Sequence, residues 1–439
     1  MKLLWEKDVP PAEWVQRFTV GEDHRWDTWL LPYDIEGTRA HAWALEQMGV
    51  LSAEERASIE RVLEELAQQA ISGALVVRPE DEDAHTVIER ALVKALGPVG
   101  EKIQAGRSRN DQVLVAIRLF AREHLVRIGR LLVSLIEPLL ELGDKHADWL
   151  MPGYTHLQRA MPSTLGLWAL GYAELLLDDL EGLRQAHDRI NSSPWGSAAG
   201  YGVPYLAMPR DAVAERLGFR RVPEAVTSVQ LSRGKLEAWV VHALVQLGAT
   251  LNRLASDLVL FSSQEFGFVE LPAAYTTGSS LMPQKRNPDV LELVRASYHR
   301  LTAELSLLLS LPANLPSGYH RDLQLTKEAL LRALLLAPEL LEAVRRTLEG
   351  ARFRRDRLEA ACTPELFATA AALERVRAGV PFRTAYREVG RALDTLRRPT
   401  KEQVLAAYQA AGYPGQTRSD GLRNRLIAHR DWLGFGPTA

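Results

Sequence analysis

The sequence predicts an all-α fold in which a central bundle of long helices is flanked by two smaller helical domains. Long apolar-periodic segments follow one another, with short breaks, from about Ser108 to Glu349. Over residues 240–261 the apolar side chains recur at steps of four and three, a 3.5-residue period typical of a long helix packed lengthwise against others. Alternating strand patterns are scarce. A chain of 439 residues also exceeds what one hydrophobic core usually supports, so we expect several domains.

Residues 1–105 are predicted to form the N-terminal helical domain. Their clearest element is an amphipathic stretch over Ala53–Ile71, which ends at the polar break Ser72-Gly73. A second break follows at Gly97-Pro98. Glycine and proline interrupt helices, so these positions mark the ends of the helical segments.

Residues 106–349 are predicted to form the bundle and the oligomerisation core. Besides residues 240–261, the apolar pattern predicts long helices over residues 125–142, 164–190 and 290–311. Several helices this long and this apolar indicate that some of the apolar surface is buried against other subunits. The alternative is that the apolar stripes form only an intramolecular core.

Residues 350–439 are predicted to form a small C-terminal helical domain. This part of the chain is rich in arginine and alanine, which favours shorter helices. Pro399 and Pro414 are expected to separate these helices, because proline cannot continue one.

Composition excludes several classes of protein. A formal net charge of −2 provides no basic field that would attract nucleic acid. The single cysteine, Cys362, rules out an intrachain disulfide framework and argues against a cysteine-based zinc site. No stretch reaches the roughly 18 uninterrupted apolar residues of a membrane span, and the first residues lack the apolar region of a signal peptide. We therefore expect a cytoplasmic protein with a small-molecule substrate and no nucleic-acid or membrane partner.

Short polar stretches stand between the helical segments. In residues 81–86 (DEDAHT) the acids are explained by a helix start, but the histidine is not. In residues 106–112 (GRSRNDQ) a serine, asparagine or aspartate can cap the following helix, yet two arginines, an asparagine and a glutamine also suit a ligand that carries carboxylates. In residues 153–158 (GYTHLQ) a histidine is expected at an exposed tip, although a lone histidine is usually structural.

Two further stretches carry denser chemistry. Residues 276–289 (TTGSSLMPQKRNPD) combine glycine, small hydroxyls, lysine and asparagine ahead of a helix, where successive backbone N–H groups can bind an oxyanion. In residues 317–327 (SGYHRDLQLTK) the polar spacing is compatible with one helical face, which could also be a solvated face. The sequence contains no nucleotide-binding G-x-x-x-x-G-K-[ST] loop, no H-E-x-x-H and no G-x-S-x-G.

These stretches, in this order, resemble the fumarase/aspartase superfamily. Residues 278–289 resemble its mobile signature loop, G-S-S-x-M-P-x-K-x-N-P, a highly specific motif. Gln284 and the runs 106–112 and 153–158 are most similar to the argininosuccinate lyase family, as are Gly318-Tyr319 and residues 321–324. The resemblance implies a fumarase/aspartase-like all-α fold and β-elimination of argininosuccinate to arginine and fumarate. It also implies a homotetramer whose active sites are shared between three subunits. The sequence gives no sign of a metal ion or an organic cofactor.

The resemblance further implies roles for individual residues. Ser279 would be the catalytic base. His156 matches the second catalytic position, where it could act as base or acid, and we favour proton donation or polarisation on the leaving guanidino side. The residues implied in substrate binding are Arg109, Asn110, Thr155, Lys285, Asn287, Tyr319, Gln324 and Lys327. Additional candidates are Asp83, His85, Ser108, Gln112, Ser280, Met282 and Arg321.

The chain departs from the family pattern in several places. A run that usually holds an Asp-Arg pair is replaced by residues 223–230 (PEAVTSVQ), and residues 199–202 are also altered. Met161 stands where glutamine is common, His320 where asparagine is common, and Asp23 near an expected serine. These changes keep two alternatives open: another fumarate-releasing lyase that acts on a related N-succinyl compound, and a non-catalytic, crystallin-like homologue.

Overall fold

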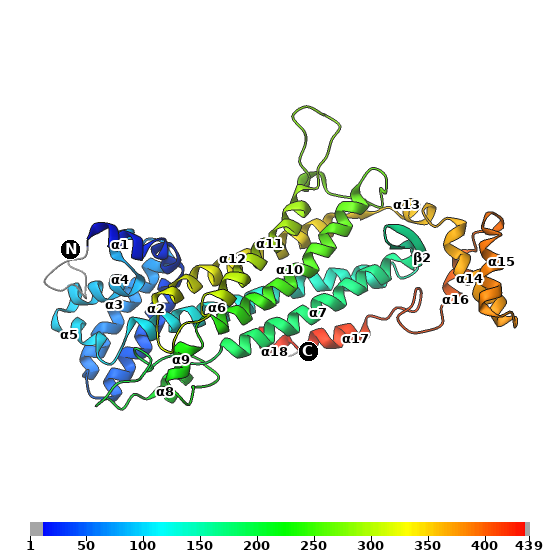
Figure 1. Ribbon diagram of the computed structural model, residues 1–439. Coiled ribbons are helices and arrows are strands. Elements are labelled where there is room, and N and C mark those ends of the chain that lie inside the picture. Colours follow the sequence, from blue (N-terminus) through cyan, green and yellow to red (C-terminus); the bar gives the residue numbers. More distant parts are fainter. Residues whose placement is uncertain (1–11, 435–439) are drawn as a thin grey trace. The chain divides into compact units, whose positions relative to one another are not determined.

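The computed structural model of the chain describes residues 12–434 and is predominantly helical, which confirms the predicted fold class (Figure 1). The described chain forms two compact units, each assembled from three separate segments. Unit 1 comprises residues 12–126, 183–244 and 301–336. Unit 2 comprises residues 127–182, 245–300 and 337–434. The three domains proposed from the sequence stay a prediction.

Five long helices contribute to both units. Each helix that the apolar pattern predicts in the bundle coincides with part or nearly all of one of them, to within one residue at the ends of 164–190 and 290–311. Their bounds are α6 Arg109–Lys145, α7 Leu165–Ile190, α10 Lys235–Ser262, α11 Asp289–Ser310 and α12 Leu325–Gly350.

Helix α10 shows why the heptad pattern identified the bundle. Its repeating apolar residues are at most 5% exposed. They are Val240 and Leu244 in unit 1, and Leu247, Leu251, Leu254, Leu258 and Phe261 in unit 2. Steps of four and three keep these side chains on one stripe of the helix, so the whole stripe is buried together.

Unit 1 also contains the N-terminal helices, and α3 begins and ends where the sequence predicts. Ser52 caps α3: its Oγ accepts a hydrogen bond from the backbone N–H of Glu55, whose side chain accepts one from the N–H of Ser52. Leu31, Leu63 and Ile88 belong to the apolar core between the N-terminal helices. The remaining elements of unit 1 are α1 Glu13–Val20, α2 Asp23–Gln47, α3 Ala53–Ile71, η1 Pro79–Asp81, α4 Ala84–Leu96, α5 Pro98–Glu101, η2 Lys102–Gln104, α8 Arg210–Arg216, α9 Thr227–Leu231 and η4 Arg321–Gln324.

Unit 2 adds short helices and two small sheets. Pro399 and Pro414 lie between helices, as expected from the sequence. The elements are β1 Leu150–Thr155, β2 Gln158–Thr164, β3 Val269–Glu270, η3 Ala273–Tyr275, β4 Arg352–Phe353, α13 Arg355–Ala360, η5 Pro364–Phe367, α14 Ala368–Arg377, α15 Phe382–Gly390, η6 Leu393–Thr395, α16 Lys401–Ala407, α17 Asp420–Ile427 and α18 Arg430–Leu433.

The antiparallel hairpin β1–β2 is the largest element that the sequence did not predict. Its register is irregular between Gly153 and Tyr154, and prolines 152 and 162 face each other across it. A bulge and paired prolines disrupt the alternation by which a strand is normally recognised. The hairpin was therefore interpreted only as a break between helices.

No described helix is long and apolar enough to cross a membrane. The first eleven residues, on which part of the expectation about a signal peptide rests, lie outside the described residues.

Candidate active site

Unit 1 contains a polar cavity of about 100 Å³. It gathers side chains from α1, α2, the start of α4, the start of α6, the turn before α10 and the segment that leads into α12. The lining residues are Thr19, Val20, Asp23, Asp27, Glu82, Asp83, His85, Arg109, Asn110, Val113, Arg233, Tyr319, Arg321, Gln324 and Lys327.

Lys327 forms a buried ion pair with two carboxylates of α2. Its Nζ lies 2.9 Å from Oδ2 of Asp23 and donates a short hydrogen bond to Oδ1 of Asp27. Lys327 is 5% exposed and Asp27 is 2% exposed. Burial alone would lower the pKa of Lys327, but the two carboxylates outweigh burial and raise this pKa. The lysine therefore stays charged, with its charge already balanced inside the protein.

His85 is held by a third carboxylate of α2, that of Asp34. Its Nδ1 contacts Oδ2 of Asp34, whose Oδ1 accepts a hydrogen bond of 2.8 Å from Nε2 of Gln112. Burial acts to lower the pKa of His85, but Asp34 and Asp83 together outweigh it, so the pKa of His85 is raised. The histidine that a helix start could not explain is thus a buried partner of acidic residues, which favour its charged form.

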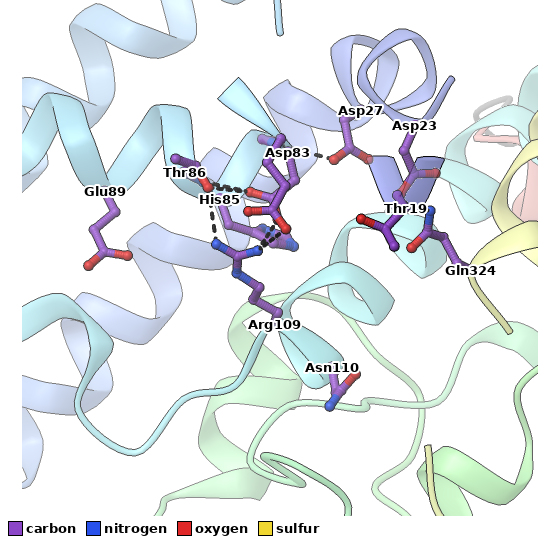
Figure 2. Close-up of polar contacts among 12 residues, drawn as sticks. Thr19, Asp23, Asp27, Asp83, His85, Thr86, Glu89, Arg109, Asn110 and Gln324 are labelled. Atoms are coloured by element: carbon purple, nitrogen blue, oxygen red, sulfur yellow. Dashed lines mark hydrogen bonds and ion pairs between the residues drawn. The ribbon is translucent and has the colours of Figure 1, made fainter. Parts of the chain in front are cut away.

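Arg109 lies between two other carboxylates of the cavity (Figure 2). Its Nη1 is 3.0 Å from Oε1 of Glu82 and 3.0 Å from Oδ2 of Asp83. Asp83 also caps α4, because its Oδ1 accepts a 2.8 Å hydrogen bond from the backbone N–H of Thr86. Burial would raise the pKa of Asp83, but His85, Arg109 and the bonds from Thr86 lower it. The acids of this stretch therefore start a helix, as the sequence indicated, and also hold Arg109.

The segment before α12 closes the cavity against the end of α1. Nη2 of Arg321 and Nε2 of Gln324 each donate a 3.0 Å hydrogen bond to the backbone carbonyl oxygen of Thr19. Among the residues drawn in Figure 2, Thr19, Asp23 and Gln324 lie together on one side, and Arg109 and Asp83 lie apart from them.

Ser108 and Gln112, which the sequence also offered as candidates, do not line this cavity. Gln112 instead supports Asp34, and Ser108 Oγ accepts a 3.3 Å hydrogen bond from the N–H of Asn110. Asp111 is 1% exposed and accepts backbone N–H groups of Gly196 and Ala198. Part of the 106–112 stretch therefore serves to fix the glycine-rich segment that follows α7.

The signature loop lies in unit 2, between η3 and α11 (Figure 1). At its base Thr277 and Asn287 exchange two backbone hydrogen bonds of 3.1 and 2.8 Å. Within the loop, Oγ of Ser279 accepts hydrogen bonds from the backbone N–H groups of Leu281 and Met282, at 3.3 and 3.1 Å. Lys285 lies on the exposed part of the loop. Two amide donors at the serine oxygen are the arrangement that stabilises negative charge there.

His156 lies at the tip of the β1–β2 hairpin, also in unit 2, and is exposed as the sequence predicts. His156 and Leu157 form the two-residue turn and have φ angles of 54° and 57°. A non-glycine pair in this left-handed region is uncommon and strained, and such strain often marks functional positions. Thr155 is the last residue of β1 and pairs with Gln158.

The structure thus brings together part of the predicted set. Arg109, Asn110, Tyr319, Gln324 and Lys327 line the cavity of unit 1. Of the additional candidates, Asp83, His85 and Arg321 also line it. The residues placed in unit 2, outside this lining, are His156, Thr155, Ser279, Ser280, Met282, Lys285 and Asn287.

The sequence interpretation missed three charged residues of the cavity. Asp27 could have been found with Asp23, because a spacing of four places two side chains on the same face of a helix. Glu82 stands among other acids that a helix start already explained. Arg233 carries no signal at all, because it lies in a short turn before α10 outside every recognised stretch.

Known proteins resemble the chain over nearly its whole length. A family model described as a lyase matches residues 14–302. An argininosuccinate lyase of Sorangium cellulosum (strain So ce56) is 44% identical over 426 residues, covering 97% of this chain and 99% of the relative. An argininosuccinate lyase of Thermotoga neapolitana is 42% identical over 386 residues, covering 88% of this chain and 97% of the relative.

Solved structures share the fold. An EDDS lyase in complex with formate has a TM-score of 0.80 at 24% identity, covering 95% of this chain and 91% of that chain. A class II fumarase from Schistosoma mansoni has a TM-score of 0.73 at 16% identity, covering 92% of this chain and 97% of that chain. The near full-length sequence relatives and the family model together show that the chain belongs to the argininosuccinate lyase family of the fumarase/aspartase superfamily.

Proposed function

We propose that this protein cleaves argininosuccinate into L-arginine and fumarate by β-elimination. The observation that carries the proposal is the 42–44% identity with argininosuccinate lyases over nearly the full chain. The polar cavity and the signature loop supply the types of group that this reaction requires.

The reaction needs a proton removed from the carbon beside a carboxylate of the succinyl group, followed by loss of the C–N bond. That C–H group is a weak acid, and its carbanion forms only if the negative charge spreads into the neighbouring carboxylate. Cations and N–H donors must therefore be in place where this charge develops. In our proposal Lys285, Asn287 and the loop amides meet this requirement.

Ser279 is the base in this mechanism. A serine hydroxyl is a poor base in water, and it can act only when desolvated and when its alkoxide is stabilised. The N–H groups of Leu281 and Met282, which already point at its Oγ, support this assignment. Closure of the loop over bound substrate would remove the remaining water.

His156 serves the leaving side by donating a proton to, or polarising, the departing guanidino group. Asn110 and Thr155 hold the succinyl carboxylates, with Arg109 close to them. Tyr319, Gln324 and Lys327 hold the arginine end. The ion pairs around Arg109 and Lys327 imply that both cations act within balanced charge clusters and not as free positive charges.

The active form is a homotetramer with shared active sites, which we place in the cytoplasm. The cavity of unit 1 is smaller than the roughly 300–1,000 Å³ of a usual small-molecule site, so it holds only part of the substrate. Apolar side chains also remain exposed on the long helices, among them Leu293 at 69% and Leu309 at 64%. Such a surface fits burial against other copies of the chain.

Product analysis tests the proposed reaction. Purified protein is incubated with argininosuccinate, and arginine and fumarate are quantified separately by chromatography. Equal amounts of the two products are expected. No cleavage by a well-folded protein, together with fumarate release from a different N-succinyl compound, would contradict the proposed substrate.

A further inference from the structure

Arg233 is a buried cation that the mechanism above does not use. It lies in the turn between α9 and α10, is 4% exposed, and lines the polar cavity. Its guanidinium carbon lies 4.8 Å from the centre of the Tyr319 ring. Its side chain also lines a neighbouring, mostly apolar cavity of about 570 Å³ within unit 1.

The hydrogen-bonding groups of this guanidinium are incompletely used. Nε and Nη1 are both buried, and neither has a hydrogen-bond partner among the described residues. Buried polar groups are almost always hydrogen bonded, so two unpaired nitrogens on one buried cation require an explanation. Glu237 lies near enough to support the charge of Arg233, but no ion pair within 4.0 Å joins the two side chains among the described residues.

Two other cations of the cavity differ from Arg233 because carboxylates surround them, whereas Arg321 bonds to the backbone carbonyl of Thr19. Arg109 lies between Glu82 and Asp83, and Lys327 lies between Asp23 and Asp27. An incoming carboxylate would have to displace a resident carboxylate from either of them. Arg233 lines the cavity and forms no ion pair within 4.0 Å with a described carboxylate, so a carboxylate that enters the cavity can pair with it without such an exchange.

We infer that Arg233 binds the α-carboxylate at the arginine end of the substrate. The inference rests on the proposed function. The location of Arg233 favours the arginine end of the substrate, because Arg233 stacks on Tyr319 and interacts electrostatically with Asp23. In the proposed function, Arg109 and Asn110 belong to the succinyl end. Tyr319 holds the guanidinium from one face, which fixes its orientation. Arg233 is therefore a specificity residue that distinguishes an amino acid from the corresponding amine.

The test compares arginine with agmatine, which lacks only the α-carboxylate. Calorimetry measures the binding of each compound to the wild type, to Arg233→Met and to a control. We expect the wild type to bind arginine about 100-fold more tightly than agmatine, because a charge-assisted hydrogen-bonded pair is lost. Arg233→Met should bind the two compounds with similar affinity, since the protein partner of the carboxylate is gone.

Arg122→Met is the matched control. Arg122 is a half-buried arginine of unit 1, whose guanidinium carbon also lies 4.8 Å from an aromatic ring, that of Phe219, but it does not line the cavity. This variant should discriminate arginine from agmatine as the wild type does. Arg233→Lys, which keeps the charge and removes the planar group that lies over Tyr319, should discriminate to an intermediate degree.

Two results would overturn the inference. One is equal binding of arginine and agmatine by the wild type, a measurement that does not require Arg233→Met to fold. The other is undiminished discrimination by folded Arg233→Met. Binding needs no turnover, so its outcome is separate from that of the lyase assay. A wild type that prefers arginine through Arg233 but does not cleave argininosuccinate would refute the proposed reaction and would still support this carboxylate subsite.

Discussion

Two cations in the cavity of unit 1 are each paired with two carboxylates of the protein. Lys327 shares its charge with Asp23 and Asp27, and Arg109 shares its charge with Glu82 and Asp83. Such pairing avoids the large cost of an isolated buried charge, and it makes each member depend on the others. A substitution in this group therefore changes stability as well as substrate binding.

Replacement of Lys327 by methionine is expected to destabilise the protein by about 3–5 kcal/mol, because it leaves the buried Asp27 and the half-buried Asp23 without their partner. From the sequence alone, loss of Lys327 would be expected to raise mainly KM. The measurement is urea unfolding followed by circular dichroism. The double variant Lys327→Met/Asp27→Asn should recover part of the loss, and an equally unstable double variant would show that the ion pair is not the cause.

His85 is expected to make stability depend on pH. Its pKa is raised in the folded protein, chiefly by Asp34 and Asp83 against the opposing effect of burial. The charge of His85 therefore contributes fully to the stability of the fold below about pH 6.5, the pKa of the residue in the unfolded chain. This contribution is lost as the pH rises through the higher pKa of His85 in the folded protein. The difference in unfolding free energy between wild type and His85→Asn should shrink over that interval.

Unfolding curves measured at a series of pH values give this difference. The exposed His242 provides a control, since His242→Asn should follow the wild-type pH profile. A difference for His85→Asn that grows as the pH rises would contradict the assignment of a raised pKa.

At the scale of single residues, the sequence revealed the stretches that carry chemistry but not their partners. Residues 81–86 were correctly interpreted as a helix start, and Asp83 does cap α4. The pairs of His85 with Asp34 and of Lys327 with Asp27 join residues 51 and 300 positions apart. No local pattern contains such separations, because they arise only when the helices pack.

Regular packing is what made the long helices predictable. Helix α10 buries one continuous stripe, so its 3.5-residue period is visible in the sequence. The β1–β2 hairpin was missed because its bulge and prolines remove the two-residue alternation on which strand prediction depends. Its turn, which carries His156, adopts left-handed backbone angles without glycine, so the usual turn signal is absent as well.

Two glycines of α7 should respond in opposite ways to the same substitution. A Cβ on Gly166 would lie 2.5 Å from the carbonyl oxygen of Gly143 and 2.6 Å from Cα of Ala147. Gly166→Ala should therefore destabilise the protein by about 1–3 kcal/mol, because backbone atoms must move apart.

Gly171 is the control within the same helix. It is exposed, and no atom outside its own helix backbone lies within 4 Å of an added Cβ. Gly171→Ala should stabilise the protein by about 0.5–1 kcal/mol through its higher helix propensity. Thermal unfolding of the two variants measures both effects, and a destabilised Gly171→Ala would contradict this account of α7.

At the scale of the whole molecule, shared active sites predict complementation between inactive variants. His156→Asn and Ser279→Ala should each form inactive tetramers. If the two residues of one site come from different subunits, tetramers reassembled from an equal mixture should regain about a quarter of wild-type activity, because subunits combine at random. Activity is measured after co-refolding, and an inactive mixture of confirmed mixed tetramers would show that one subunit supplies both residues.

The most direct test of the central claim is the rate of fumarate formation from argininosuccinate by the wild type and by Ser279→Ala, measured with EDTA present. We expect steady fumarate release by the wild type and a loss of several orders of magnitude in kcat for the variant, with unchanged folding, because the base of the proton abstraction is missing. A folded Ser279→Ala with near-normal kcat would contradict the role of Ser279, and a folded wild-type protein that releases no fumarate would contradict the proposed reaction.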